Sequence, residues 1–286
     1  MAAVRPMRDD DVAIAHDIML AAFGDLARRE ADDQPPPPPP ADPTPAHERF
    51  HHLMRTDPGG AWVSVDRDDR PTGAALALVR EGLWGLSLLV VRPDAQSSGA
   101  GGALLRASLE HGRDARGGVI LASSDARALR AYHRAGFTMH PAARAAGVPE
   151  GLTADPAVVA FDAARDARMA DAVGRAVRGA PHGDDLTAFA RGGATLLALP
   201  GRGFAAIRDG DVKLVAATDE PAATALLRTA LVRCGGRAEV SWLTGAQRWA
   251  VDVLVEARME LSVWGAVFLR GDVGPFTPYL PSGAYL

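Results

Sequence analysis

The sequence predicts a mixed α/β fold that is built from two copies of one unit. In the first half, apolar stretches with the period of strands alternate with stretches that have the period of helices. In addition, the letters of 103–109, Ala-Leu-Leu-Arg-Ala-Ser-Leu, return at 225–231 as Ala-Leu-Leu-Arg-Thr-Ala-Leu. We therefore expect two domains, a first copy over 1–150 and a second copy over 151–286.

The first elements are two helices joined by a proline-rich segment. Asp10 or Asp11 can cap a helix that runs to about Leu26, and a second, short helix is expected over 44–55. The run Pro35–Pro40 between them favours an extended polyproline II conformation and cannot continue a helix. We interpret this run as a surface loop, and the alternative is a binding segment for an SH3-like partner.

Strands and helices then alternate. The residues at 83–91 are apolar almost throughout, as expected of a strand that is buried on both faces. Asp125 can cap the last helix, which ends at Gly136. In order, we expect a hairpin of 62–66 with 72–80, a buried strand at 83–91, a helix at 101–111, a strand at 119–122 and a helix at 126–135.

The composition excludes several classes of protein. The chain has 286 residues and a formal net charge of −4, and no basic cluster or nucleic-acid-binding motif is visible, so we expect no nucleic-acid partner. Cys234 is the single cysteine, which excludes an internal disulfide and a cysteine metal cluster, and we expect no metal. Neither a signal peptide nor an apolar run of about 20 residues is visible. We therefore expect a cytoplasmic protein without a membrane partner.

A glycine-rich turn joins the buried strand to the helix that follows it. Residues 96–102 read Gln-Ser-Ser-Gly-Ala-Gly-Gly. Small residues let the backbone approach a ligand closely, and the first amides of a helix point outward because they have no partners inside the helix. Together with the positive end of the helix dipole, these amides form an anion site that suits a pyrophosphate.

Two common nucleotide-binding motifs do not fit this turn. A Walker A loop needs a lysine followed by Ser or Thr after its last glycine, whereas Gly102 and Ala103 stand here. The dinucleotide fingerprint needs a glycine or alanine three residues beyond Gly101, where this chain has Leu104. ATP and NAD are therefore poor fits.

The order Gln-x-x-Gly-x-Gly resembles the loop with which the GCN5-related N-acetyltransferase (GNAT) family binds the pyrophosphate of CoA. Downstream, Tyr132, Gly136 and Phe137 match the Tyr-x-x-x-Gly-Phe pattern of that family. The chain departs from the family at two places. Ser97 and Ser98 stand where the family often has a basic or polar loop residue, and Ser124-Asp125 stands where it often has an Asn. The resemblance spans about residues 1–140, and with the repeat it implies two tandem GNAT-like domains.

The resemblance implies acetyl-CoA as the cofactor and assigns roles to residues. Tyr132 would protonate the departing CoA thiolate as general acid, since an ordinary phenol with a pKa of about 10 still holds its proton. The alternative is that Tyr132 only packs against the sheet. The expected cofactor-binding residues are Leu89, Val90, Val91, Gln96, Ser97, Ser98, Gly99, Ala100, Gly101, Gly102 and Asp125.

The sequence leaves the general base open. The strand at 83–91 offers Ser87 and no glutamate. A water molecule could serve as the base. By analogy with tandem proteins of the enhanced-intracellular-survival type, the terminal carboxylate at Leu286 could also serve. The apolar, proline-stiffened segment 275–286 is expected to dock on the protein. Three histidines are further candidates: His51, His52 and His133.

We expect the second copy to be degenerate. The offset of 225 − 103 = 122 maps the turn onto 217–222, Ala-Thr-Asp-Glu-Pro-Ala, which has two carboxylates and a proline without an amide donor. The same offset maps the strand 119–122 onto 241–244 and Tyr132 onto Leu254. This copy is expected to complete the fold, or to wall the acceptor site, without binding CoA.

The sequence thus predicts an N-acetyltransferase that transfers an acetyl group from acetyl-CoA to a primary amine of a small molecule or a protein. A non-catalytic acyl-CoA-binding or sensor protein on the same fold is one alternative. An interaction module that uses the proline run is the other. Neither the acceptor nor the oligomeric state follows from the sequence.

Overall fold

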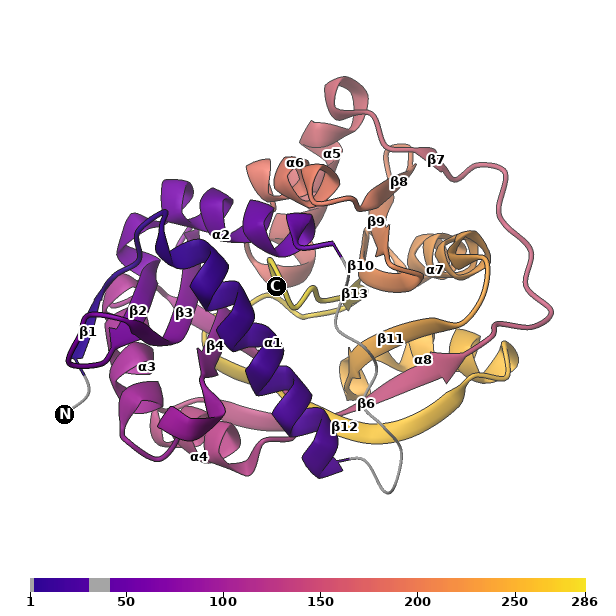
Figure 1. Ribbon diagram of the computed structural model, residues 1–286. Coiled ribbons are helices and arrows are strands. Elements are labelled where there is room, and N and C mark those ends of the chain that lie inside the picture. The colour runs from indigo at the N-terminus through magenta and orange to yellow at the C-terminus, as the bar shows by residue number, and fades with distance from the viewer. Residues whose placement is uncertain (1–2, 31–41) are drawn as a thin grey trace. The chain divides into compact units, whose positions relative to one another are not determined.

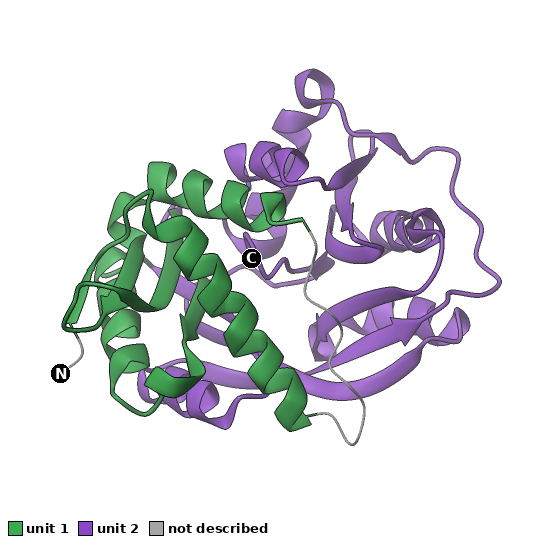
Figure 2. Cartoon of the chain, in the orientation of Figure 1, with its two compact units in different colours: residues 1–79, 84–115 green, residues 80–83, 116–286 purple. Residues whose placement is uncertain are grey.

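The computed structural model describes residues 3–30 and 42–286, so the proline run lies outside the described residues. The chain divides into two compact units (Figure 2). The first unit holds residues 1–79 and 84–115, and the second holds residues 80–83 and 116–286. The division of the sequence at residue 150 stays a prediction.

The first unit combines a set of neighbouring strands, in the order β1-β2-β3-β4, with three α-helices (Figure 1). Strand β2 pairs antiparallel with β1 and with β3, while α3 packs on β1 and β2, and α1 packs against α2. Its elements are β1 (Ala3–Pro6), α1 (Asp11–Glu30), α2 (Thr44–Thr56), η1 (Pro58–Gly60), β2 (Ala61–Val65), β3 (Pro71–Arg80), β4 (Leu83–Val91), η2 (Pro93–Ala95) and α3 (Ala100–His111).

A buried tryptophan fixes β4 against α3 in this unit. Trp84 is fully buried, and its indole N–H donates to the carbonyl oxygen of Ser108 on α3 at 3.0 Å. The helix ends at Gly112, where a Cβ would lie only 2.1 Å from the Trp84 ring, so no larger residue fits. The predicted buried strand at 83–91 is confirmed, and its side chains are largely buried.

The second unit contains strands in two sheets, ordered β5-β12-β6-β11 and β13-β10-β9-β8-β7. Its elements are β5 (Gly117–Ala122), α4 (Ala126–Arg134), β6 (Thr138–Gly147), β7 (Val159–Ala160), α5 (Ala163–Arg178), α6 (Asp184–Arg191), β8 (Thr195–Leu199), β9 (Gly203–Arg208), β10 (Asp211–Ala217), α7 (Glu220–Cys234), β11 (Ala238–Leu243), η3 (Gly245–Gln247), α8 (Arg248–Glu256), β12 (Glu260–Gly271) and β13 (Tyr279–Leu280).

Strands from the two predicted copies alternate in the first of these sheets. Strand β12 pairs antiparallel with β5 on one side, where Phe268 faces Ile120, and with β6 on the other, where Phe268 faces Met139. Strand β6 pairs in turn with β11. Strands β5 and β6 precede residue 150 and β11 and β12 follow it, so the copies exchange strands here.

The structure confirms the internal repeat. Helix α8 begins 248 − 126 = 122 residues after α4, and β12 begins 260 − 138 = 122 residues after β6. The helix of the second copy that carries the repeated letters, α7, is buried along one face at Leu226, Leu227 and Leu231. These leucines belong to a continuous apolar core that also holds Trp249 of α8.

Candidate functional site

The predicted anion-binding turn lies between β4 and α3. Strand β4 ends at Val91 and helix α3 begins at Ala100, and the residues between them are exposed or half-buried. Two residues of the turn have left-handed backbones, Ser97 with φ +64° and Gly99 with φ +89°. Alternation of this kind curves the chain into a concave row of amides, which favours anion binding.

The helix that follows the turn begins with free amide donors. Its N-cap residue is Gly99, and no side chain caps it in the usual way. Ala100 makes a long hydrogen bond of 3.4 Å to the Ser98 hydroxyl. The amides of Gly101 and Gly102 donate to no group in the part of the chain that the structure describes. Two outward donors at the positive end of a helix form an anion site.

The glycine at 101 is not needed by the protein's own packing. A Cβ on Gly101 would meet only Val91 Cγ2 at 3.6 Å, an ordinary contact. At Gly99 no atom lies within 4 Å of the added Cβ, but its positive φ strains any other residue. Packing therefore does not require glycine at 101, whereas the backbone conformation favours glycine at 99.

Side chains of the turn hold its shape. The Gln96 amide donates to the carbonyl oxygen of Val91 at 3.2 Å, and the Ser98 hydroxyl donates to the carbonyl oxygen of Ala95 at 2.7 Å. Of the remaining predicted cofactor contacts, Val90 is buried, whereas Leu89 and Val91 are half-buried. The structure therefore places ten of the eleven predicted contacts along one continuous stretch, 89–102, of the first unit.

Tyr132, the predicted general acid, belongs to the second unit, in α4. It is buried, and its ring meets that of Phe268 edge to face, with centroids 5.5 Å apart. Burial raises the pKa of the phenol well above its ordinary value, and the charge of Asp125 raises it further. Burial therefore favours the protonated hydroxyl and makes it a weaker acid than an ordinary phenol.

Asp125 is already engaged within the second unit. As predicted, it caps α4: its carboxylate accepts the amide of Arg127 at 2.8 Å. The same carboxylate pairs with the Arg127 guanidinium at 2.6 Å. A role of Asp125 in binding the cofactor stays a prediction.

The histidine candidates for the base differ in environment. His52 is buried, and its Nδ1 lies 3.2 Å from Nη2 of Arg55, so it accepts from that guanidinium. His51 is half exposed and 3.7 Å from Asp9, and His133 is exposed on α4. None of the three has an arrangement that singles it out as a base.

The segment 275–286 docks on the second unit, as predicted. Tyr279, Tyr285 and Leu286 are buried. The buried Arg178 guanidinium donates to the main-chain oxygens of Tyr285 at 2.9 Å and Leu286 at 2.7 Å. The Tyr279 hydroxyl also donates to the main-chain oxygen of Leu286.

His182 completes this buried network. Its Nε2 lies 3.2 Å from the Tyr279 oxygen, and since that hydroxyl gives its proton to Leu286, Nε2 carries a proton and donates. Burial, then the charges of Arg178 and Arg80, hold the pKa of His182 well below its ordinary value. No motif in the sequence indicates Arg178 or His182, because each joins the buried network through contacts with residues that are distant in the sequence.

In the second copy the turn is missing altogether, which corrects the mapping of a loop onto 217–222. Ala217 is the last residue of β10 and Glu220 the first of α7, so only 218 and 219 lie between them. Asp219 caps α7 by accepting the amide of Ala222 at 2.9 Å, and it pairs with Arg202 at 2.6 Å. A carboxylate already occupies this helix terminus, so a second anion is repelled.

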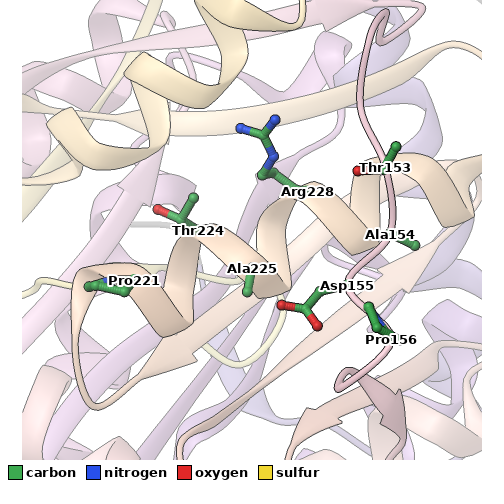
Figure 3. Close-up of a pocket in the computed structure, with 8 residues that line it drawn as sticks. All are labelled: Thr153, Ala154, Asp155, Pro156, Pro221, Thr224, Ala225 and Arg228. Carbon is green, nitrogen blue, oxygen red and sulfur yellow. The ribbon is translucent and has the colours of Figure 1, made fainter.

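A shallow hollow of about 400 Å³ lies elsewhere on the second unit, between α7 and the segment before β7 (Figure 3). Its basic side chain, Arg228, forms a two-pronged ion pair with Glu256 at 2.7 and 2.9 Å. No predicted site residue lines it. The lining residues are Thr153, Ala154, Asp155, Pro156, Pro221, Thr224, Ala225 and Arg228.

No three His, Cys, Asp or Glu side chains among the described residues lie together as a metal ion would require. Within 3–30 and 42–286, no helix combines the length and the apolar character that crossing a membrane requires.

Comparison with known proteins agrees with this geometry. The model of the acetyltransferase (GNAT) family matches residues 27–137, which include both the turn and Tyr132. The search of curated protein sequences found no significant match.

Solved structures share the fold over nearly the whole chain. A candidate acetyltransferase from Pyrococcus horikoshii is similar with a TM-score of 0.75 and 17% identity, over 94% of this chain and 89% of that one. A GCN5-related N-acetyltransferase from Sphaerobacter thermophilus has a TM-score of 0.56 and 18% identity, over 94% and 95%. A tandem GNAT protein from the clavulanic acid biosynthesis pathway has a TM-score of 0.57 and 13% identity, over 95% and 98%.

The solved structures show that the chain has the fold of acetyltransferases. Within it, residues 27–137 match the model of the acetyltransferase (GNAT) family, and the whole chain shares its fold with a tandem GNAT protein. The prediction of two GNAT-like domains is thereby confirmed.

Proposed function

We propose that the chain is an N-acetyltransferase that transfers the acetyl group of acetyl-CoA to a primary amine, with its site in the first copy. The observation that carries the proposal is the pair of free amides at Gly101 and Gly102, at the start of a helix that no side chain caps. Two linked phosphates are the ligand that such a donor set suits. The family match over 27–137 supports acyl-CoA as the source of those phosphates.

The other predicted contacts follow the chain on both sides of this anion site. We propose that the backbone of 96–102 surrounds the pyrophosphate, because Gln96 and Ser98 already hold the turn in an open curve. The main chain of 89–91 is proposed to bind the thioester end, where its amides would stabilise charge on the acetyl oxygen. For Asp125 the proposal rests on position alone, because its carboxylate is bonded to Arg127.

Acetyl-CoA, when bound, supplies the acetyl group as an activated thioester. Attack requires a neutral amine, so the acceptor gives a proton to a base. The C–N bond would then form and the C–S bond break, the sulfur would take a proton, and the second proton lost by the nitrogen would restore the group that protonated the sulfur. We propose that Tyr132, which burial keeps in its protonated form, donates that proton as negative charge develops on the sulfur. A water molecule, a histidine or a carboxylate at Leu286 stays the candidate base.

The proposed setting follows the composition. The acceptor is an amine on a small molecule or a protein, and the protein acts in the cytoplasm without a nucleic-acid or membrane partner.

An acceptor screen tests this proposal. The purified chain is incubated with acetyl-CoA and panels of amino sugars, polyamines, aminoglycosides and peptides with free amines, and release of the CoA thiol is followed. We expect release above the blank with one of these classes. Binding of acetyl-CoA without turnover on any panel would favour the non-catalytic acyl-CoA-binding alternative, and no binding at all would contradict the assigned site.

A further inference from the structure

The second copy contains the same elements as the first around its lost cofactor site. Strand β10 precedes helix α7 as β4 precedes α3, so Val215–Ala217 take the place of Leu89–Val91. The offset of 122 places Gln247 at the position of Asp125, since 247 − 125 = 122, and helices α8 and α4 begin directly after these two residues. The proposed function assigns both of these first-copy positions to acetyl-CoA.

In the second copy the strand end is already paired. The last residues of β10 form an antiparallel ladder with β13, in which Val215 faces Leu280 and Ala216 faces Tyr279. The amide of Ala217 donates to the carbonyl oxygen of Pro278 at 3.3 Å. The edge of the strand therefore bonds to the chain itself and has no amide left to offer there.

The counterpart of Asp125 binds the same segment. The Gln247 side-chain amide donates to the carbonyl oxygens of Phe276, at 2.8 Å, and Tyr279, at 3.1 Å. Its own oxygen accepts the amide of Thr244 at 2.9 Å and the Thr244 hydroxyl at 2.8 Å. Gln247 is fully buried, and while its oxygen caps η3 through Thr244, both of its donated hydrogen bonds go to residues 276–279.

We propose that residues 276–280 occupy, in the second copy, the place that the amide-bearing pantetheine arm of acetyl-CoA takes in the first. This inference rests on the proposed function. A peptide is a chemical match for that arm, because both present amide N–H and C=O groups at similar spacing along a narrow chain. The second copy is thus closed by its own chain, and each molecule binds one acyl-CoA.

Burial makes the closure stable. Phe276, Tyr279 and Leu280 are almost completely buried, so releasing the segment would expose a large apolar area. The amide of Phe276 also donates to the carbonyl oxygen of Val177 at the end of α5, at 2.8 Å. A ligand that competes for this groove must displace these contacts, and it finds no phosphate site at α7 to compensate.

Hydrogen exchange and native mass spectrometry test the inference on the full chain. Without ligand, we expect slow exchange over 213–219 and 276–281, and no change there when acetyl-CoA is added, while 96–103 becomes protected. Native spectra should show one acetyl-CoA per chain. A second bound acetyl-CoA, or slower exchange over 276–281 when acetyl-CoA is added, would overturn the proposal.

Two matched substitutions separate this inference from the proposed function. Gln247→Met puts an apolar side chain of similar size in place of the amide and removes its four hydrogen bonds, two of them to residues 276–279, so exchange over 276–281 should rise about tenfold or more. Gln96→Met, the matched control in the first copy, should leave that segment unchanged and affect 91–98. Unchanged exchange over 276–281 in Gln247→Met would refute the closure. If wild-type chain fails to bind acetyl-CoA, the proposed function fails while this exchange comparison still decides the closure.

Discussion

The rings of Tyr132 and Phe268 meet edge to face, with centroids 5.5 Å apart and planes inclined by 74°. Phe268 lies on β12, the strand that the second copy inserts between β5 and β6. The proposed general acid of the first copy is therefore packed against a side chain of the second. This contact gives the second copy a direct part in orienting the phenol.

Replacing Phe268 by leucine should loosen Tyr132 without removing its hydroxyl. We expect a stability loss of about 1 kcal/mol from the lost aromatic pair and a several-fold lower kcat. Urea unfolding and steady-state kinetics measure the two effects. Phe204→Leu is the matched control, because Phe204 is equally buried and pairs edge to face with Phe161. Equal losses of kcat in both variants would show that Phe268 does not position Tyr132.

Removing the Tyr132 hydroxyl tests its chemical role. In Tyr132→Phe we expect kcat to fall about 100-fold, the lower range for loss of a general acid, because the CoA sulfur then leaves without a proton donor. The dissociation constant of acetyl-CoA should change by less than about twofold, since the ring remains in place. A variant that turns over at the wild-type rate would leave Tyr132 as a packing residue only.

Gly99→Ala should weaken acetyl-CoA binding through the backbone. Its φ of +89° strains an L residue, at a cost of about 1 kcal/mol, and relief of the strain would change the turn. Gly235→Ala is the matched control: its φ is +70° and, as at Gly99, no atom meets an added Cβ within 4 Å. Calorimetry should show lower affinity for acetyl-CoA only in Gly99→Ala. Equal affinity in both variants would argue against the turn as the binding site.

Stability should fall as the pH drops below about 6.5, the ordinary pKa of histidine. His182 keeps a lowered pKa in the fold, so between the two pKa values the unfolded chain binds a proton that the folded chain does not. The free energy of unfolding therefore decreases with falling pH, by at most about 1.4 kcal/mol per unit for this group. Burial, and then the charge of His47, lower the pKa of His16, so this histidine also makes the free energy of unfolding decrease as the pH falls. Chemical denaturation of His182→Gln at pH 5 to 7 should give a shallower slope than wild type, and identical slopes would contradict this.

The local parts of the fold could be predicted from the sequence. The buried strand at 83–91, the cap at Asp125 and the repeat offset all depend on neighbouring residues, and the structure has them where the patterns place them. The turn proposed to bind the pyrophosphate could be recognised for the same reason, because glycines at a strand-to-helix junction expose amides whatever the rest of the chain does.

The remaining parts depend on contacts between distant segments. Strand β1 (Ala3–Pro6) is short and contains Arg and Pro, so only its pairing with β2 makes it a strand. The sequence of β12 does not show that this strand lies between β5 and β6, because the backbone hydrogen bonds of a strand can be satisfied by any neighbouring strand. The offset predicted a loop at 217–222, but the second copy has lost that loop, so the alignment holds only from α7 onward.

Calorimetric titration of acetyl-CoA into Gly101→Glu tests the central claim most directly. A glutamate in the first turn of α3 is compatible with the helix, because acidic groups are favoured there, but its carboxylate competes with the phosphates for the free amides. Gly236→Glu adds the same charge at an exposed glycine with open space around it. We predict one acetyl-CoA bound per chain in wild type and Gly236→Glu, and none in Gly101→Glu. Wild-type affinity in Gly101→Glu would contradict the account.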